Sequence, residues 1–228
     1  MKNLMIYVHP SKGFTEEYAG LVKVQIDDAV RRWKKENIIL AVNFPYSYNG
    51  FDSIVVPDDL FCGHHKKASK INVIYYLIDN KMIDGLCWFH DFDAYQLQEL
   101  PEDLLGDKDA AFTDYGFNPS WNTGSFFFTP KARDVFELIR TTMDRRHANE
   151  EQTLNLLTSK NTANINQRYK KLNNTYNLGQ KWESDFAYKK ADKPIRVLHF
   201  HPRMPDVYER VKPLIPDYLM EIFKKHGY

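Results

Sequence analysis

The sequence predicts a single α/β domain with a mixed, mainly parallel central sheet flanked by helices. Three observations support this prediction. Short apolar runs alternate with amphipathic helical patterns through the first half of the chain, as in folds built on parallel strands. The length of 228 residues suits one large domain, and neither a repeat nor a low-complexity linker divides it. Hydrophobic residues make up 43% and charged residues 27%, which excludes disordered and fibrous proteins.

The first half of the chain supplies the parallel strands and their crossover helices. Residues 4–8 form a short apolar run closed by a His-Pro pair, which predicts the first strand. Thr15 precedes two glutamates, as at a helix N-terminus, and apolar residues then recur every three or four positions. The run at 71–78 keeps helical spacing and supplies a crossover, so we expect a helix there rather than a strand. The other strands expected in this half are 38–44, 54–56 and 86–89.

The second half has a less regular pattern. A helix is expected from Thr129-Pro130 to Met143, and Asn149 is expected to cap another. The polar, Asn-rich segment 161–176 is expected to be a loop or a poorly packed helix. The remaining expected elements are strands at 110–113, 125–129 and 195–200 and a closing helix, interrupted by two prolines, within 207–225.

Charge, cysteine content and missing motifs exclude several classes of protein. The chain carries 31 Lys and Arg against 30 Asp and Glu, a net charge of +1, which excludes a dedicated nucleic-acid coat. Its two cysteines, Cys62 and Cys87, form no CxxC pair, which excludes a thiolate zinc site and favours a reducing compartment. The chain has no GxxxxGKS/T, GxGxxG or GxSxG motif, which argues against P-loop, dinucleotide-binding and hydrolase folds. No apolar run is long enough for a membrane span, so we expect a cytoplasmic protein.

The most informative motif is Asp91-Phe92-Asp93, directly after the expected strand at 86–89. Ligands of open α/β sheets bind at the carboxyl ends of strands, and continued extension would place both carboxylates on one side. Adjacent carboxylates repel unless a cation lies between them, and their oxygens favour Mg²⁺ or Mn²⁺, ions that typically hold a diphosphate. The alternative is a pair of solvated carboxylates in a loop.

Two later segments also carry candidate site residues. His199 and His201 end the late strand and, being two positions apart, are expected to point the same way. Alternatively, one of them is buried and hydrogen-bonded and the other lies on the surface. Gly124 precedes a very apolar run, where it could let the backbone approach a ligand or could bend the entry of a strand.

Acidic residues open the helix that follows Asn149. Glu150 and Glu151 stand where the helix dipole favours negative charge, and Gln152 stands at the capping-box position. Helix capping alone explains these residues, so a catalytic role for them depends on other evidence.

In this order, the motifs resemble those of a GT-A glycosyltransferase. The segments that carry the resemblance are the acidic strand end at 86–93, Asn122-Thr123-Gly124 with the apolar residues after it, the helix start at 149–155 and the late strand at 197–201. The resemblance implies a single GT-A-like domain over residues 1–228. It would comprise a donor-binding half, about 1–95, and an acceptor-side half, about 96–228.

The resemblance implies a metal and donor site. Asp91 and Asp93 would be the DXD pair that binds Mn²⁺ or Mg²⁺ with the diphosphate of a nucleotide-sugar, and His199 would complete the metal site. Tyr7 and His9 would hold the nucleotide base. The other residues expected to contact the donor or the sugar are Lys66, Lys70, Asn122 and Gly124.

The resemblance also implies residues beside the reacting sugar. Glu151 or Gln152 would lie there, and Glu150 or Glu151 would be the base if the reaction inverts the sugar. A retaining reaction would need no such base. The family's frequent Gly-x-x-Lys-Pro-Trp sequence after the late histidine is replaced here by Pro202-Arg203-Met204-Pro205, so Arg203 is expected to contact the phosphates instead.

The activity implied by the resemblance is metal-dependent transfer of a sugar from a nucleoside-diphosphate sugar to an acceptor hydroxyl. The net charge of +1 favours a saccharide acceptor. A hydroxylated base in DNA stays open as an acceptor, because the basic clusters Arg145-Arg146 and Arg168-Tyr169-Lys170-Lys171 lie in the acceptor-side half.

Two other classes of function remain open. A haloacid-dehalogenase-like phosphatase also has DxD after a strand, but on its first strand and followed by Thr or Val where this chain has Tyr95. A non-catalytic binding module could use the basic and aromatic surfaces of the chain instead of a metal site.

Overall fold

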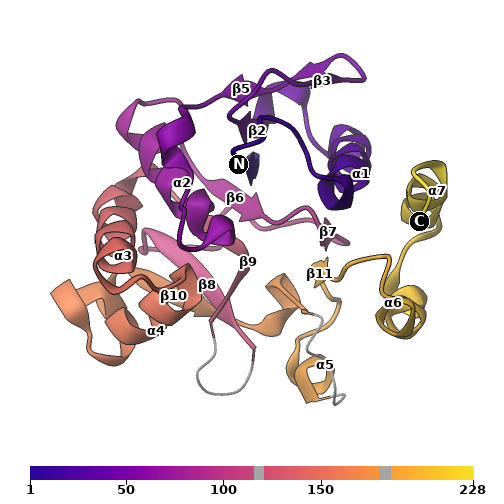
Figure 1. Ribbon diagram of the computed structural model, residues 1–228. Coiled ribbons are helices and arrows are strands. Elements are labelled where there is room, and N and C mark those ends of the chain that lie inside the picture. The colour runs from indigo at the N-terminus through magenta and orange to yellow at the C-terminus, as the bar shows by residue number, and fades with distance from the viewer. Residues whose placement is uncertain (116–120, 180–185) are drawn as a thin grey trace.

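The structure, a computed structural model, describes residues 1–115, 121–179 and 186–228 (Figure 1). Its central sheet consists of β1 (Lys2–Tyr7), β2 (Ile38–Val42), β5 (Ile54–Val55), β6 (Cys87–His90), β8 (Ala110–Asp114), β9 (Trp121–Phe128) and β10 (Tyr169–Leu172). The seven strands follow the order β10-β8-β9-β6-β1-β2-β5. β9 is antiparallel to both of its neighbours, and the other neighbouring pairs are parallel. The prediction of a mixed, mainly parallel sheet is confirmed.

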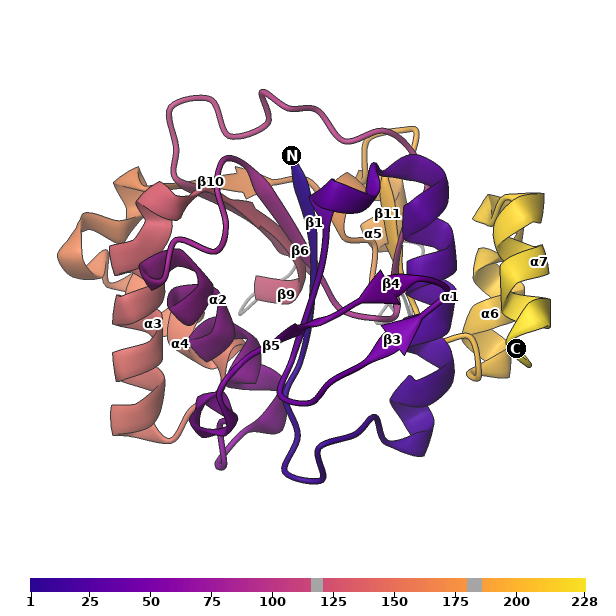
Figure 2. The same ribbon diagram turned by 90° about the horizontal axis from the view of Figure 1, so that it is seen from above.

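Helices cover both faces of this sheet (Figure 2). Their bounds are α1 (Glu16–Arg32), α2 (Ser69–Asp79), α3 (Arg133–Arg146), α4 (Glu150–Ser159), α5 (Phe186–Lys190), α6 (Pro205–Val211) and α7 (Asp217–Lys225). α2, α3 and α4 lie together on one side, whereas α1 lies on the other with α6 and α7 outside it. Among the described residues, no helix combines the length and the apolar character that crossing a membrane requires.

Burial on both faces explains why the central strands are apolar throughout. In β1, Leu4 packs into the core beneath α2 and α3, whereas its neighbour Met5 packs into the core beneath α1. Ile39 and Leu40 of β2 alternate in the same way. Strands covered on both faces are typically continuous apolar runs, which is the pattern that predicted them.

A second, two-stranded sheet lies beside the end of β6 and brings a late segment of the chain to it. β7 (Ala94–Gln96) pairs antiparallel with β11 (Val197–His199), and His199 lies opposite Ala94. This pairing joins the late strand to the acidic motif that precedes β7. A third sheet, a hairpin of β3 (Ser47–Tyr48) and β4 (Phe51–Asp52), contacts α1 through Tyr48.

Two segments differ from the expectation. β9 begins at Trp121, four residues before the expected strand, because it extends past the end of β6 and pairs with β8, with Asn122 opposite Thr113. The polar segment 161–176 contains β10, where a loop or helix was expected. β10 is an edge strand, and its Lys170 and Lys171 are exposed while Leu172 is buried, so its composition is more polar than that of a central strand.

Candidate functional site

The acidic motif lies where β6 ends and the chain turns into β7. Residues Asp91 to Asp93 form a turn in which Ala94 N donates to Asp91 O at 3.0 Å, so the expected continuous extension of the strand is wrong. The turn still leaves both carboxylates on one side, and the pairing of β7 with β11 adds His199. One ligand atom from each of Asp91, Asp93 and His199 lies within 4.8 Å of the other two.

This donor set fits a divalent ion. Two carboxylates supply the hard oxygen ligands that Mg²⁺ and Mn²⁺ prefer, and an imidazole nitrogen favours the transition-metal ion of the two. The three side chains are partly buried, so an ion held by them would still have open positions for water or a ligand. Asp91, Asp93 and His199 are therefore the residues of this region that could hold a metal.

Asp93 and His199 form a close, partly buried ion pair. His199 Nε2 lies 3.0 Å from Asp93 Oδ1. Burial opposes charge on both groups, but their mutual attraction and hydrogen bond outweigh it. The pKa of Asp93 is lowered to about 2, and the pKa of His199 is raised above its ordinary value. In the absence of a metal, this pairing therefore favours the carboxylate form of Asp93 and the imidazolium form of His199.

Lys70, on α2, is buried at the centre of a second group of charges. Its Nζ lies 2.9 Å from Thr123 O, 3.2 Å from Glu150 Oε1 and 3.4 Å from Asp91 Oδ1. Burial disfavours the ammonium, but Asp91 and Glu150 outweigh it and raise the pKa of Lys70. The pKa of Glu150 is lowered in turn, against the effect of its burial. Lys70 thus joins the acidic turn to the start of α4.

Glu151 faces the same region from the first turn of α4. Its Oε1 accepts hydrogen bonds from Thr123 N at 3.1 Å and from Tyr115 OH at 3.3 Å. Thr123 Oγ1 donates to Glu150 Oε1 at 3.0 Å, so one residue of β9 contacts both acids. Sequence reasoning missed Thr123, although it lies between two residues that the sequence singled out.

Two of the expected site residues lie outside this group. Gln152 is exposed and its side chain closes a capping box, in which its Oε1 accepts from Asn149 N at 3.3 Å. Lys66 is exposed on a short 3₁₀ turn, Lys66–Ala68, just before α2. The structure therefore gives Gln152 the capping role that its position predicted.

The carboxyl end of β1 carries a group of aromatic rings beside the acidic turn. The ring of Tyr7 lies 4.8 Å from that of Phe14, 5.0 Å from that of Tyr18 and 6.4 Å from that of Phe92, measured between centroids. His9 lies 5.9 Å from Tyr7 in a stacked arrangement. Burial, and next the charge of the nearby Asp91, raise the pKa of Tyr18, so these rings adjoin the carboxylates.

His201 and Arg203 have different neighbours from His199. The ring of His201 contacts that of Tyr228, at 6.4 Å between centroids, and its Nδ1 accepts from Arg203 N at 3.1 Å. The Arg203 guanidinium lies over the same tyrosine ring, 5.2 Å from its centroid. His199 instead contacts Asp93 and Asn177, so the two imidazoles have different partners and the contacts do not bring them to one site.

Asn122 and Gly124 lie in β9, beside His199. The backbone N of Gly124 donates to Asn122 Oδ1 at 3.1 Å, and the carbonyl of Gly124 accepts from Asp91 N at 2.8 Å. Asn177, which follows the polar segment, lies between Asn122 and His199 and was missed by sequence reasoning. An Asn in an Asn-rich stretch gave no signal that could have distinguished it from its neighbours.

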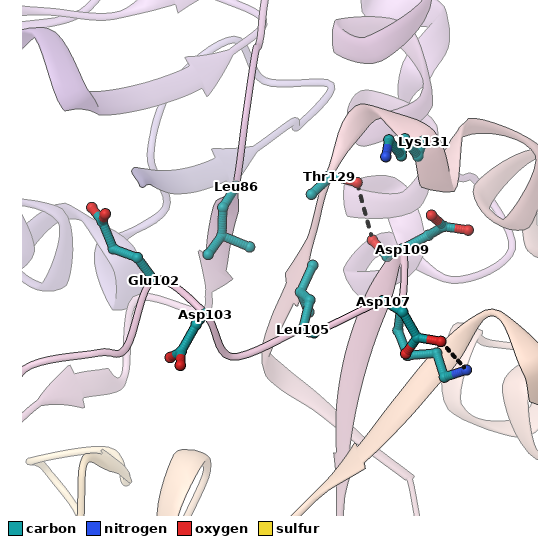
Figure 3. Close-up of a pocket in the computed structure, with 10 residues that line it drawn as sticks. Leu86, Glu102, Asp103, Leu105, Asp107, Asp109, Thr129 and Lys131 are labelled. Carbon is teal, nitrogen blue, oxygen red and sulfur yellow. Dashed lines mark hydrogen bonds and ion pairs between the residues drawn. The ribbon is translucent and has the colours of Figure 1, made fainter.

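A separate cavity lies at the other end of β6 (Figure 3). It has a volume of about 290 Å³ and is lined by Leu86, just before β6, by Thr129, just after β9, and by the acidic residues Glu102, Asp103 and Asp107 among others. Because it opens at the opposite ends of these strands, it does not belong to the site around Asp91.

The chain is similar to known proteins in structure but matches none of the compared families or curated proteins in sequence. No family model matches the chain, and no curated protein matches it in sequence. The similar solved structures include an active-site mutant of LgtC, at 15% identity and a TM-score of 0.63, with 97% of this chain and 100% of that chain covered. They also include the glycosyltransferase GlyE of Streptococcus pneumoniae TIGR4, at 14% identity and a TM-score of 0.61, with 98% of this chain covered.

A third similar structure is mouse xyloside xylosyltransferase 1, at 11% identity and a TM-score of 0.54, with 90% of this chain and 98% of that chain covered. The chain spans 63% of the length of the GlyE chain and the full length of the LgtC chain. The GT-A fold implied by the sequence motifs is therefore confirmed, as a single α/β unit with the arrangement found in these glycosyltransferases.

Proposed function

We propose that the protein is a metal-dependent glycosyltransferase that moves a sugar from a nucleoside-diphosphate sugar to an acceptor hydroxyl. The observation that supports this most is the convergence of Asp91, Asp93 and His199 at the carboxyl end of β6, in a chain with the fold of known glycosyltransferases. Ligands of such sheets bind at this end of the strands. A Mn²⁺ or Mg²⁺ ion held there would neutralise the charge that develops on the departing diphosphate.

The balance of charge around the site supports a bound cation. The possible metal ligands and the charges around Lys70 together contain, among the described residues, four carboxylates but only one lysine and one histidine. These are Asp91, Asp93, Glu150, Glu151, Lys70 and His199. Even with His199 protonated, negative charge is in excess. A divalent ion would offset this excess, and the diphosphate of the donor would then bind to the ion.

Lys70 is placed to position other groups rather than to contact the phosphates. A lysine has three N–H donors, and those of Lys70 face Thr123 O, Glu150 Oε1 and Asp91 Oδ1. We therefore assign Lys70 the role of fixing Asp91 as a metal ligand. This assignment replaces the direct phosphate contact that the sequence suggested for it.

Glu151 is the acid that we place beside the reacting sugar. Glu150 is buried and committed to Lys70 and Thr123, whereas the partly buried Glu151 is oriented by Thr123 N and Tyr115 OH. With its carboxylate fixed by two donors, Glu151 can accept a proton or stabilise positive charge on the sugar ring.

The two halves of the chain would then contribute different parts of the site. The aromatic group around Tyr7 and the acidic turn belong to residues 1–95 and would bind the donor, with Tyr7 and His9 beside its base. The start of α4 and His199 belong to residues 96–228, which would also bind the acceptor.

A saccharide acceptor remains the preferred one. Arg168, in one of the two basic clusters that left DNA open as an acceptor, is paired with Asp109 and Asp134. Lys171 of the same cluster is paired with Asp114, and Lys170 donates to a backbone carbonyl. These internal partners reduce the charge that the cluster could offer to DNA phosphates. Transfer to DNA would also fall steeply with added salt, whereas transfer to a saccharide would not.

Thermal unfolding with a panel of UDP- and GDP-sugars tests the proposal. One nucleotide-sugar with Mn²⁺ is expected to raise the melting temperature of the protein, because a ligand stabilises the state that binds it. The same ligands are expected to leave the melting temperature of Asp93→Asn unchanged. Stabilisation by a phosphomonoester alone, or by none of the nucleotide-sugars, would contradict the proposed function.

A further inference from the structure

We infer that Asn177 positions His199, by selecting which of its two ring nitrogens faces the acidic turn, and that Gly124 leaves the space that this position requires. This inference rests on the proposed function, in which His199 is a metal ligand. It assigns a role to a residue directly after the polar segment, which neither the sequence motifs nor the resemblance included.

The amide of Asn177 has only one possible orientation. Its side chain is buried, at 1% exposure, between the carbonyl of Asn122 and the ring of His199. The carbonyl oxygen of Asn122 can only accept, so the Asn177 Nδ2 must face it, at 3.1 Å. The Oδ1 of Asn177 therefore faces the His199 Nδ1, also at 3.1 Å.

This orientation determines the state of the imidazole. An amide oxygen can only accept a hydrogen bond, so the His199 Nδ1 must carry a proton and donate it. The lone pair available to a metal ion is then that of Nε2, which is the nitrogen that faces Asp93 at 3.0 Å. Histidine ligands of metals commonly donate their other N–H to a partner of this kind, which holds the ring and fixes its tautomer.

The backbone fixes Asn177 relative to His199. The next residue, Leu178, donates to Val197 O at 3.0 Å and accepts from His199 N at 2.8 Å, so the segment is hydrogen-bonded along β11. These backbone hydrogen bonds hold the main chain of Asn177 beside His199, and the burial of the side chain restricts its rotation away from the imidazole.

Gly124 provides space for the imidazole. A Cβ at position 124 would lie 2.1 Å from His199 Cε1 and 2.5 Å from His199 Nδ1, far inside van der Waals contact. The imidazole of His199 thus lies against a backbone that has no side chain at this point, and only a glycine permits this position.

Mn²⁺ affinity, measured by electron paramagnetic resonance of the free ion without any donor, tests the inference. Asn177→Leu keeps the approximate size of the side chain and removes both hydrogen bonds, and we expect it to weaken Mn²⁺ binding about 10- to 100-fold. Asn177→Asp keeps an acceptor for the His199 Nδ1–H but loses the donor to Asn122 O, so we expect it to weaken Mn²⁺ binding less than Asn177→Leu does. Asn174→Leu, at another buried Asn three residues earlier, is the control and is expected to bind Mn²⁺ as the wild type does.

The melting temperature in EDTA, measured for all three variants, detects a general loss of structure. Such a loss would lower the melting temperatures without producing the expected order of Mn²⁺ affinities. Wild-type affinity in Asn177→Leu, or equal weakening in Asn177→Leu and Asn177→Asp, would overturn the inference and leave the proposed function intact. A wild-type protein that binds no Mn²⁺ would overturn both the inference and the metal dependence in the proposed function.

Discussion

Two groups of charged side chains in this molecule contain buried acids, and they differ in the basic residues that surround those acids. The site cluster, Asp91, Asp93, Glu150, Glu151, Lys70 and His199, lies at the carboxyl end of β6. The helix clasp, Asp27, Tyr48, Lys225 and His226, joins α1 to the end of α7. In the clasp, Asp27 Oδ2 lies 2.7 Å from Lys225 Nζ, 2.8 Å from His226 Nε2 and 3.3 Å from Tyr48 OH.

The two groups differ in the balance of their charges. The clasp surrounds one buried acid with two basic groups and a hydroxyl, so the chain itself satisfies the carboxylate. The site cluster holds more acids than bases, which costs stability unless a cation binds. The comparison teaches that a group whose basic residues satisfy its acid serves to hold the fold. A group with an excess of acids instead indicates a place where a bound cation would balance the charge.

The largest difference between the groups is expected from their lysines. Lys70→Met would leave Glu150 buried without its cation, and we expect the free energy of unfolding to fall by about 3–5 kcal/mol. Lys225→Met, the matched change in the clasp, removes a lysine whose side chain is 59% exposed, so we expect a loss below about 1 kcal/mol. Denaturant titration measures both values. Equal losses in the two variants would show that burial does not distinguish the groups.

A smaller effect on stability, but a selective effect on metal binding, is expected at Gly124. Gly124→Ala forces the His199 ring to move, and we expect Mn²⁺ affinity to fall about 10- to 100-fold and stability to fall by about 1–3 kcal/mol. Gly63→Ala is the control, because a Cβ there meets no atom within 4 Å. Isothermal titration with Mn²⁺ measures the affinity. Wild-type affinity in Gly124→Ala would mean that His199 is not a ligand.

The smallest effect is expected in the clasp, and it depends on pH. Burial acts to raise the pKa of Asp27, but hydrogen bonds from Lys225 and His226 outweigh it and lower the pKa. A lowered pKa in the folded state adds stability above the unfolded pKa, and this stability is lost as the pH falls through the folded value. We therefore expect Asp27→Asn to cost about 1 kcal/mol at pH 7 and progressively less below the ordinary aspartate pKa of 3.8.

Turnover should not respond to the same change. Asp27 belongs to α1 and contacts α7 and the β3–β4 hairpin, so Asp27→Asn is expected to transfer sugar at the wild-type rate. Unfolding curves from pH 3 to pH 7 and a turnover assay at pH 7 check both statements. A constant difference in stability across that range would show that Asp27 has the same pKa in the folded and unfolded states, which would contradict its lowered pKa in the clasp.

The parts of the site that are local in sequence could be predicted. Asp91 and Asp93 follow an apolar strand within the same short segment, so their place at a strand end is visible without the fold. The capping box at Asn149 and Gln152 is likewise a pattern of four consecutive residues. His199 was expected at the metal site because the order of the motifs resembles that of the GT-A family. The pairing of β7 with β11 places it beside the acidic turn.

The parts that depend on distant contacts could not be predicted. Lys70 contacts residues 21, 53 and 80 positions away, namely Asp91, Thr123 and Glu150, and no periodicity records such contacts. β10 has the composition of a loop because it is an edge strand with two exposed lysines. The turn after β6 was also missed, since an acidic motif after a strand does not indicate whether extension continues.

The most direct test of the proposed metal-dependent transferase activity is the rate at which nucleoside diphosphate is released from the nucleotide-sugar that binds. We expect turnover with Mn²⁺ and a loss of at least about 100-fold on chelation with EDTA or in Asp93→Asn, because the stabilisation of the leaving diphosphate is lost. The melting temperature of Asp93→Asn without ligand should stay near that of the wild type. Full turnover in EDTA, or in a folded Asp93→Asn variant, would contradict the metal assignment on which the account depends.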